Sequence, residues 1–146
     1  MKYVNPKIFV VLAAILMLVS ACGPSQIPVT GEKEAPSMVE PIEGSEYSRV
    51  ILTEKAVERL DIQTAKVSTM DGSQNKVIPY AAVMYGLEGE TWAYTNPEAQ
   101  VYIRQPIVID HIDGDMAILT DGPDVDTPVV VVGASLLYGA EVGVSK

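Results

Sequence analysis

Apolar and polar residues alternate in short runs over most of the chain after residue 46. Runs such as KVIPY, TWAYT, MAILT and VVVVG are separated by segments rich in Gly, Asp, Asn and Pro. Short period-two runs between turn residues are typical of all-β domains. We therefore expect residues 47–146 to form an all-β domain, a small barrel or sandwich of about six to eight short strands with one short helix.

Three local patterns refine this expectation. In TEKAVERL, Thr53 can cap a helix of one or two turns, with Leu52 and Val57 placed as a hydrophobic staple. The DGD at residues 113–115 predicts a tight hairpin, because Asp-Gly tolerates positive φ angles. The long apolar segment AQVYIRQPIVIDHI is interrupted at Pro106, where we expect a bend.

The first residues have the layout of a secretory signal. Lys2 and Lys7 precede an apolar stretch at residues 8–19, which is too short to cross a bilayer, and small residues lead to Cys22. The end of this segment, VSAC, resembles the lipobox of bacterial lipoproteins. That resemblance implies cleavage of residues 1–21 and lipidation of Cys22, a lipid anchor on the extracytoplasmic side of a bacterial membrane. The alternative is an ordinary signal peptide with an incidental cysteine.

Residues 22–46 differ in composition from the rest of the chain. After Cys22, GPSQIPVTGEKEAPSMVEPIEGSE is rich in Pro, Gly and Glu and shows little apolar periodicity. This composition is typical of a flexible tether, so we expect the folded domain to begin at residue 47. Cys22 is the only cysteine, so the chain cannot form an internal disulfide.

The charge balance excludes one class of partner. The chain carries a net charge of −9, and removal of Lys2 and Lys7 with the signal would make it more negative. Binding to nucleic acid through phosphate contacts needs a basic surface, so we expect no nucleic-acid partner. An acidic domain held at a membrane by lipid fits the composition.

The search for reactive groups yields weak candidates. DHIDGD gathers Asp110, His111, Asp113 and Asp115, but it fails the EF-hand pattern at its first and last ligand positions. Ordinary turn chemistry is the alternative to a metal site here. His111 is the only histidine, and Ser135 does not lie in a nucleophile elbow.

Other polar, sulfur-bearing and aromatic residues could have a functional role, but each also has an ordinary structural explanation. Glu88 and Glu90 could act as paired carboxylates, but they lie on a turn that would hold their geometry poorly. The scattered methionines could ligate copper(I) or fill the core; they are Met70, Met84 and Met116. The aromatic residues could form a binding platform or an aromatic core; they are Trp92, Tyr94 and Tyr102. We predict no catalytic residue, no cofactor and no metal site, and therefore no enzyme.

The order of these elements resembles one known family. VILTEKAVERLDIQTAKV, then VIPYAAVMYGLEGETWAYT, then VYIRQPIVIDHIDGDMAILTDGPDVDTPVVVVGASLLYG are similar to the membrane-proximal domain of periplasmic adaptor subunits of efflux systems, the membrane fusion proteins. The similarity spans residues 50–141. In these adaptors further domains separate the first segment from the second, whereas here Val67 and Lys76 are joined by a short turn. Asp126 stands where the family often has glycine.

The resemblance implies a function without bond-making chemistry. We expect a lipid-anchored, non-enzymatic adaptor or accessory of an efflux-type membrane transporter, with that transporter or another envelope protein as its partner. A ligand- or metal-binding envelope lipoprotein that reuses the same β fold is the alternative, because a fold does not fix a function.

Overall fold

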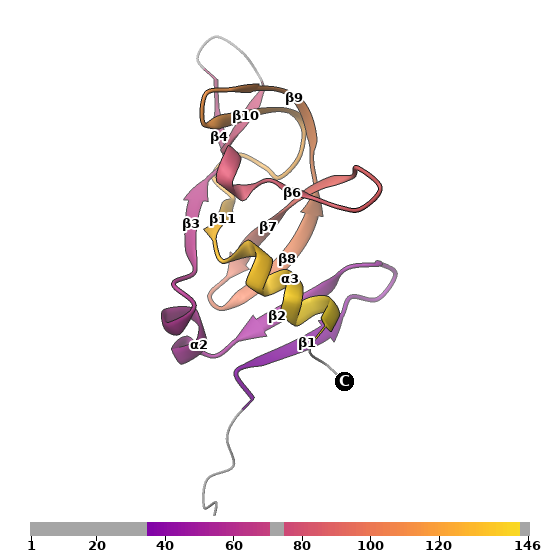
Figure 1. Cartoon of the computed structure of the whole chain (residues 1–146), viewed down its shortest axis with the longest axis vertical. Helices are drawn as coiled ribbons and strands as arrows, with labels where there is room; N and C mark the ends of the chain where they lie inside the picture. The colour runs from indigo at the N-terminus through magenta and orange to yellow at the C-terminus, as the bar shows by residue number, and fades with distance from the viewer. Residues whose placement is uncertain (1–34, 71–74, 144–146) are drawn as a thin grey trace, which may run out of the picture. The chain divides into compact units, whose positions relative to one another are not determined.

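A computed structural model describes residues 35–70 and 75–143. Two antiparallel β-sheets make up most of this part of the chain (Figure 1). The first sheet has the order β1-β2-β8-β7-β11-β3, with β6 added on β7. Its strands are β1 (Ser37–Pro41), β2 (Ser48–Leu52), β3 (Gln63–Lys66), β6 (Met84–Tyr85), β7 (Thr91–Glu98), β8 (Val101–Pro106) and β11 (Pro128–Val132). The second sheet has the order β4-β5-β10-β9. Its strands are β4 (Ser68–Thr69), β5 (Lys76–Pro79), β9 (Val108–Asp113) and β10 (Met116–Asp121).

The two sheets are joined at two sharp corners. Val67 separates β3 from β4, and Ile107 separates β8 from β9. Both corner residues are buried, and both keep a backbone hydrogen bond: Val67 N–H donates to Thr127 O at 3.0 Å, and Ile107 N–H to Thr91 O at 3.0 Å. Strands that bend from one sheet into the other are typical of barrel-like β folds. The predicted bend therefore occurs directly after Pro106.

An aliphatic core lies between the facing sides of the two sheets. It draws small and branched side chains from both sheets and from both corners. Its buried members are Val67, Ile78, Ala82, Val83, Ala93, Ile107, Ala117, Leu119 and Val129. Since corners and strands contribute alike, this core fixes the angle between the sheets.

A second core lies on the other face of the seven-stranded sheet. The period of two in β7 sends Ala93 to the first core, while Trp92 and Tyr94 join the second. Two helices contribute to this second core: α2 (Glu54–Arg59) through Ala56, and α3 (Ala134–Gly143) through Ala134 and Leu137. Strand β7 is thus covered on both faces, which explains its run of buried residues.

The predicted helix is confirmed as α2. Thr53 is its N-cap, and the Thr53 hydroxyl accepts a hydrogen bond from Ala56 N–H at 3.2 Å. Leu52 is buried in the second core and Val57 packs against the same core, as the staple requires. Glu54 lies in the first turn and Arg59 in the last, each at the helix end that favours its charge.

Several connections between elements contain a residue with positive φ. Gly114 has a φ of +59° in the β9–β10 hairpin, which confirms the predicted DGD turn. Gly133 has a φ of +91° between β11 and α3. Asp126 has a φ of +69°, a region that favours glycine and tolerates aspartate. This is the position at which the adaptor family often carries glycine.

The predicted start of the folded domain, at residue 47, was wrong. The expected tether reached residue 46, yet Ser37–Pro41 forms β1 and pairs along its length with β2. An exposed ion pair between Arg49 and Glu40, at 3.7 Å, spans these strands. Three other parts of the prediction lie outside the described residues. They are the expected signal at residues 1–21, Cys22, and residues 71–74 of the predicted turn.

The all-β class is confirmed, but three details differ. The described part has eleven strands rather than six to eight, because bent strands divide at the corners and β4 and β6 are only two residues long. Tyr80, the last residue of the run KVIPY, begins the 3₁₀ turn η1 (Tyr80–Ala82) instead of continuing the strand. One short helix was expected, but the described part has a second one, α3.

Candidate functional site

A charged and aromatic cluster lies under α3, against the second core. We call it the Arg104 cluster; its members are Tyr47, Trp92, Tyr94, Arg104, Tyr138 and Glu141. Three separate parts of the chain meet here: the entry to β2, the neighbouring strands β7 and β8, and the helix α3. Tyr94 and Arg104 are direct partners in the β7–β8 register, which places their side chains side by side.

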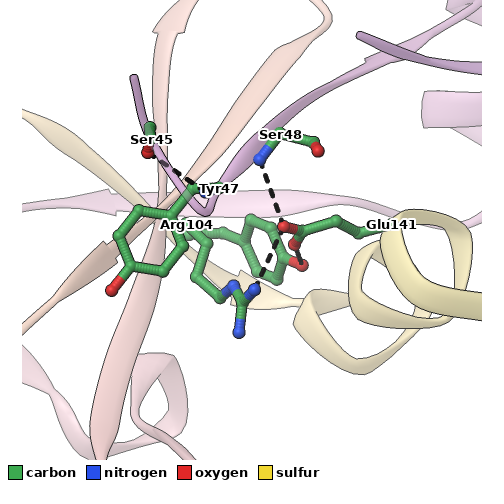
Figure 2. Close-up of polar contacts among 6 residues, drawn as sticks. Ser45, Tyr47, Ser48, Arg104 and Glu141 are labelled. Carbon is green, nitrogen blue, oxygen red and sulfur yellow. Dashed lines mark hydrogen bonds and ion pairs between the residues drawn. The ribbon is translucent and has the colours of Figure 1, made fainter. Parts of the chain in front are cut away.

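The centre of the cluster is an ion pair that excludes most solvent. Arg104 Nη2 lies 3.2 Å from Glu141 Oε1, and the side chains are 17% and 4% exposed. Figure 2 shows the Glu141 carboxylate reached from one side by the backbone of Ser48 and from the other by Arg104. Ser48 N–H donates to Oε1 at 3.3 Å. The Tyr94 hydroxyl donates to Oε2 in a short hydrogen bond.

Aromatic rings surround the guanidinium group. Its Cζ lies 5.0 Å from the ring centroid of Tyr47, 4.9 Å from that of Trp92 and 5.6 Å from that of Tyr138. Trp92 and Tyr138 are themselves in contact, with centroids 5.1 Å apart. A desolvated cation over an aromatic face contributes about 2 kcal/mol in favourable cases. The rings therefore offset part of the cost of removing the Arg104 charge from water.

Two N–H groups of the cluster have no hydrogen-bond partner among the described residues. They are Arg104 Nε and Trp92 Nε1, both fully buried atoms. An unpaired buried donor costs about 1–3 kcal/mol. The Glu141 carboxylate accepts from three other groups, which are Ser48 N–H, the Tyr94 hydroxyl and Arg104 Nη2.

Burial perturbs the phenol groups of this region. Desolvation, and then the hydrogen bond to the Glu141 carboxylate, raise the pKa of Tyr94 far above its ordinary value of 10.0. Desolvation also raises the pKa of Tyr47, with a further contribution from its hydrogen bond to Glu46. These tyrosines therefore stay neutral donors over the whole physiological pH range.

The arrangement can hold α3 on the sheet. The Arg104 guanidinium lies against the Glu141 carboxylate, which is enclosed by its three donors. Removal of one partner of such a pair leaves a buried charge without compensation, which typically costs about 3–5 kcal/mol. We infer that this cluster is an anchor of the fold.

A second conspicuous feature is exposed instead of buried. The β6–β7 hairpin projects from the body of the domain (Figure 1). Leu87 at its turn is fully exposed, and Tyr85 at its base is 55% exposed. Tyr80 of η1 is 43% exposed, and the Tyr85 hydroxyl donates to the Tyr80 hydroxyl at 3.4 Å. We call Tyr80, Tyr85 and Leu87 the Leu87 patch.

The structure separates several residues that the sequence singled out. His111 and Asp110 are exposed on β9, with His111 Nδ1 2.9 Å from Asp110 Oδ2. Ser135 lies exposed in the first turn of α3, a helix that packs on the seven-stranded sheet, whereas β9 belongs to the other sheet. No group of three or more His, Cys, Asp or Glu side chains in residues 35–70 and 75–143 is arranged to hold a metal ion.

The remaining candidates occupy turns and cores. Glu88 and Glu90 lie in the β6–β7 turn, where the Glu90 carboxylate accepts from Glu88 N–H at 3.0 Å. Met84 packs against the second core, and Met70 and Met116 are half-buried on other elements. The three aromatic candidates of the strands all lie in the second core, which favours the aromatic-core interpretation; they are Trp92, Tyr94 and Tyr102.

Sequence reasoning missed Arg104 and Glu141, although signals for both were present. In VYIRQP, Arg104 falls on the same strand face as the buried Tyr102, so a charge occupies an inward position. On α3, the residues that meet the sheet recur at i, i+3, i+4 and i+7; they are Ala134, Leu137, Tyr138 and Glu141. An inward cation and an acid on an apolar helical face predict a buried pair.

The chain was compared with models of known protein families, with characterised proteins and with solved structures, and no match was found. No helix in the described part of the chain is long and apolar enough to cross a membrane.

Proposed function

We propose that the protein is a lipid-anchored, non-enzymatic accessory of an efflux-type membrane transporter, and that it acts on the extracytoplasmic side of the membrane. The proposal combines the expected lipid anchor at Cys22 with the resemblance to the membrane-proximal domain of periplasmic adaptors. It assigns the domain a role in contact and positioning.

The observation that carries the proposal is the join between the two resembling segments. Residues 50–67 and the chain from Val77 onward belong to one β domain, in which β4 and β5 pair directly as Ser68↔Val77 and Thr69↔Lys76. In the adaptors, by resemblance, the same two segments are separated by further domains and yet build one domain. Here a hairpin replaces the separation, so the domain stands without the parts that would extend toward an outer-membrane channel.

The local geometry of one late turn also supports the resemblance. Asp126, at the position where the family often has glycine, adopts the left-handed conformation that glycine favours. Its N–H donates to Val67 O at 2.9 Å, at the corner where the first resembling segment ends. The turn in this chain thus has the left-handed backbone conformation that a glycine adopts most easily.

The test examines anchoring and partnership together. Cells would express the tagged full chain or its Cys22→Ser variant, and membranes would be extracted in mild detergent. The proposal predicts that the full chain fractionates with membranes and co-purifies with a multi-span transport protein. It also predicts that cells without the gene retain a compound that the transporter exports.

The variant supplies the control. Cys22→Ser should be unprocessed or released from the membrane, and it should lose the co-purifying transporter. If Cys22→Ser is still cleaved before residue 22 and stays in the membrane fraction to the same degree, the anchor is wrong. If the anchored chain recovers no transport protein and its loss changes no export, the proposed function is wrong.

A further inference from the structure

The Leu87 patch has the properties of a docking surface. Leu87 is fully exposed, and two further apolar side chains nearby in the chain, Tyr80 and Tyr85, are 43% and 55% exposed. Tyr85 lies two residues before Leu87 in the same hairpin, and its hydroxyl group donates to that of Tyr80. Rigid aromatic side chains next to an exposed aliphatic one are typical of binding surfaces, since they offer contact area at a low entropic cost.

The hairpin that carries the patch is held in a defined shape. Gly86 N–H donates to Glu90 O at 2.9 Å and closes the turn, and Gly89 adopts a φ of +89°. The Glu90 side chain folds over Gly86, where an added Cβ would lie 1.7 Å from Glu90 Oε1. Tyr80 is fixed from the other side, because its N–H donates to Asp115 O at 2.7 Å.

The rim of the patch is acidic. Glu88 and Glu90 follow Leu87 in the turn and are exposed. One more acid lies close to Tyr80, since Tyr80 N–H donates to Asp115 O at 2.7 Å. None of these three acids takes part in an ion pair with a described residue.

A second loop of the same domain provides a contrast. Val125 is 44% exposed and is also flanked by two acids, Asp124 and Asp126. There, however, Lys76 lies 3.4 Å from Asp124 and Lys66 lies 3.5 Å from Asp126. The acids beside Val125 are thus paired within the domain, whereas those beside Leu87 leave their charge for a partner.

We propose that the Leu87 patch docks into an apolar pocket with a basic rim on the extracytoplasmic surface of the transporter. This inference rests on the proposed function and names the surface through which that function acts. Charge complementarity selects the occupant, because a second copy would present the same acids and an anionic lipid surface would repel them. The apolar patch supplies contact area and the acidic rim supplies orientation.

Site-specific cross-linking in cells tests the proposal with the full, anchored chain. A photoreactive benzophenone amino acid would replace Leu87 in one variant and Val125 in the matched control. Both sites are exposed, so both variants should keep the melting temperature of the parent chain. We expect the adduct with a multi-span transport protein to be at least about fivefold more abundant from position 87, and its cross-linked segment to be rich in Lys and Arg.

Variants that remove the charges of Glu88 and Glu90 test the role of the acidic rim. The double variant Glu88→Gln and Glu90→Gln keeps the acceptor for Glu88 N–H, and it should lower the adduct from position 87 at least about threefold. The matched double variant Asp124→Asn and Asp126→Asn should leave that adduct unchanged. Equal yields in the two double variants would overturn the charge argument.

The other outcomes also decide the matter. A homodimer adduct from position 87 would assign the patch to a second copy, and adducts with lipid alone would assign it to the bilayer; either result overturns the proposal. A transporter adduct from Val125 with none from position 87 would overturn this surface and keep the proposed function. No adduct from either position, together with no co-purifying transporter, would overturn both.

Discussion

Replacement of Glu141 by glutamine isolates the charge of the buried pair. Glutamine has nearly the same shape, and its one side-chain oxygen can still accept from Ser48 N–H, while its NH2 group replaces Oε2 and donates to the Tyr94 hydroxyl. The negative charge opposite Arg104 is lost, and the hydrogen bond with Tyr94 reverses its direction. Glu141→Gln therefore tests whether the Arg104 cluster depends on the ion pair or on packing alone.

The expected magnitude follows from the geometry. At 3.2 Å and an effective dielectric constant of about 20, two unit charges attract by about 5 kcal/mol. Desolvation of both groups offsets part of this, and loss of one partner from a buried pair typically costs about 3–5 kcal/mol. Because the Arg104 side chain keeps 17% exposure, we expect a loss near the lower limit, about 3 kcal/mol. For a domain of this size that corresponds to a fall in Tm of about 12 °C.

Urea unfolding of the purified chain is the assay. Trp92 is the only tryptophan and lies in the cluster, so its fluorescence reports the site directly. Two controls accompany it. Asp126→Asn breaks an exposed ion pair, with side chains 79% and 70% exposed, and should cost less than about 0.5 kcal/mol. Combining Glu141→Gln with Arg104→Met removes both charges and should cost less than Glu141→Gln alone.

A loss below about 1 kcal/mol for Glu141→Gln would refute the reasoning, because the anchor would then be packing alone. The same holds if the double variant loses the sum of the two single losses, since uncoupled groups do not form a pair. Amide hydrogen exchange gives an independent measurement. Weaker protection should appear first in α3, whose carboxylate no longer holds Arg104.

Three further predictions concern the alkaline limit, a strained glycine and the join. The pKa of Tyr94 is raised in the folded state, so its contribution to the free energy of unfolding is fully present below about pH 10. Above that pH the free energy of unfolding should fall by up to about 1.4 kcal/mol per pH unit for this group. Thermal melts at several pH values should show a smaller fall for Tyr94→Phe. Gly133→Ala should lower the free energy of unfolding by at least about 2 kcal/mol, because the new Cβ would lie 2.3 Å from Ile62 Cδ1 at a φ of +91°. Gly89→Ala is the control, since its Cβ would meet no atom within 4 Å, and it should cost less in the same denaturation series. A Gly/Ser insert after Gly72, between β4 and β5, should cost only about 0.6 kcal/mol per doubling of loop length, whereas the same insert inside β11 should unfold the domain; equal damage in thermal melts would remove the main support for the adaptor resemblance.

Local patterns predicted the elements whose residues decide their own conformation. Thr53 caps α2 through its own hydroxyl, and Gly114 takes the positive φ of its turn. Val129 and Val130 of β11 are buried, as the continuous apolar run predicts, whereas Val132 at its end is 39% exposed. In each case the physical cause lies within a few residues of its effect, so the sequence alone was sufficient.

The elements that were missed depend on distant partners. Strand β1 contains Pro and Glu and has low strand propensity, but β2 supplies its hydrogen bonds and Pro36 O accepts from Thr53 N–H at 3.1 Å. Helix α3 contains Gly139, and its inward face becomes favourable only against the second core. For both, tertiary contacts override a weak local preference.

The Arg104 cluster could be predicted only in outline for the same reason. An inward arginine requires a counter-charge, but several acids in the chain could have supplied it, and Glu141 lies 37 residues away along the sequence. What selects Glu141 is the position of α3, which depends on Leu137 and Ala134 reaching the second core. Packing therefore determines which acid pairs with Arg104.

The Arg104 cluster and the Leu87 patch both lie next to strand β7. Strand β6 is held on β7 through the pairs Met84↔Trp92 and Tyr85↔Thr91, and the Trp92 ring is fixed by Tyr138 and Arg104. The base of the β6–β7 hairpin therefore lies beside Trp92, whose side chain the Arg104 cluster immobilises. A binding group is positioned only as precisely as the residues that support it. Loss of the Glu141 charge should then lower cross-linking from position 87 even at temperatures where the domain stays folded. An unchanged yield in that variant would mean that the hairpin is positioned by its own hydrogen bonds alone.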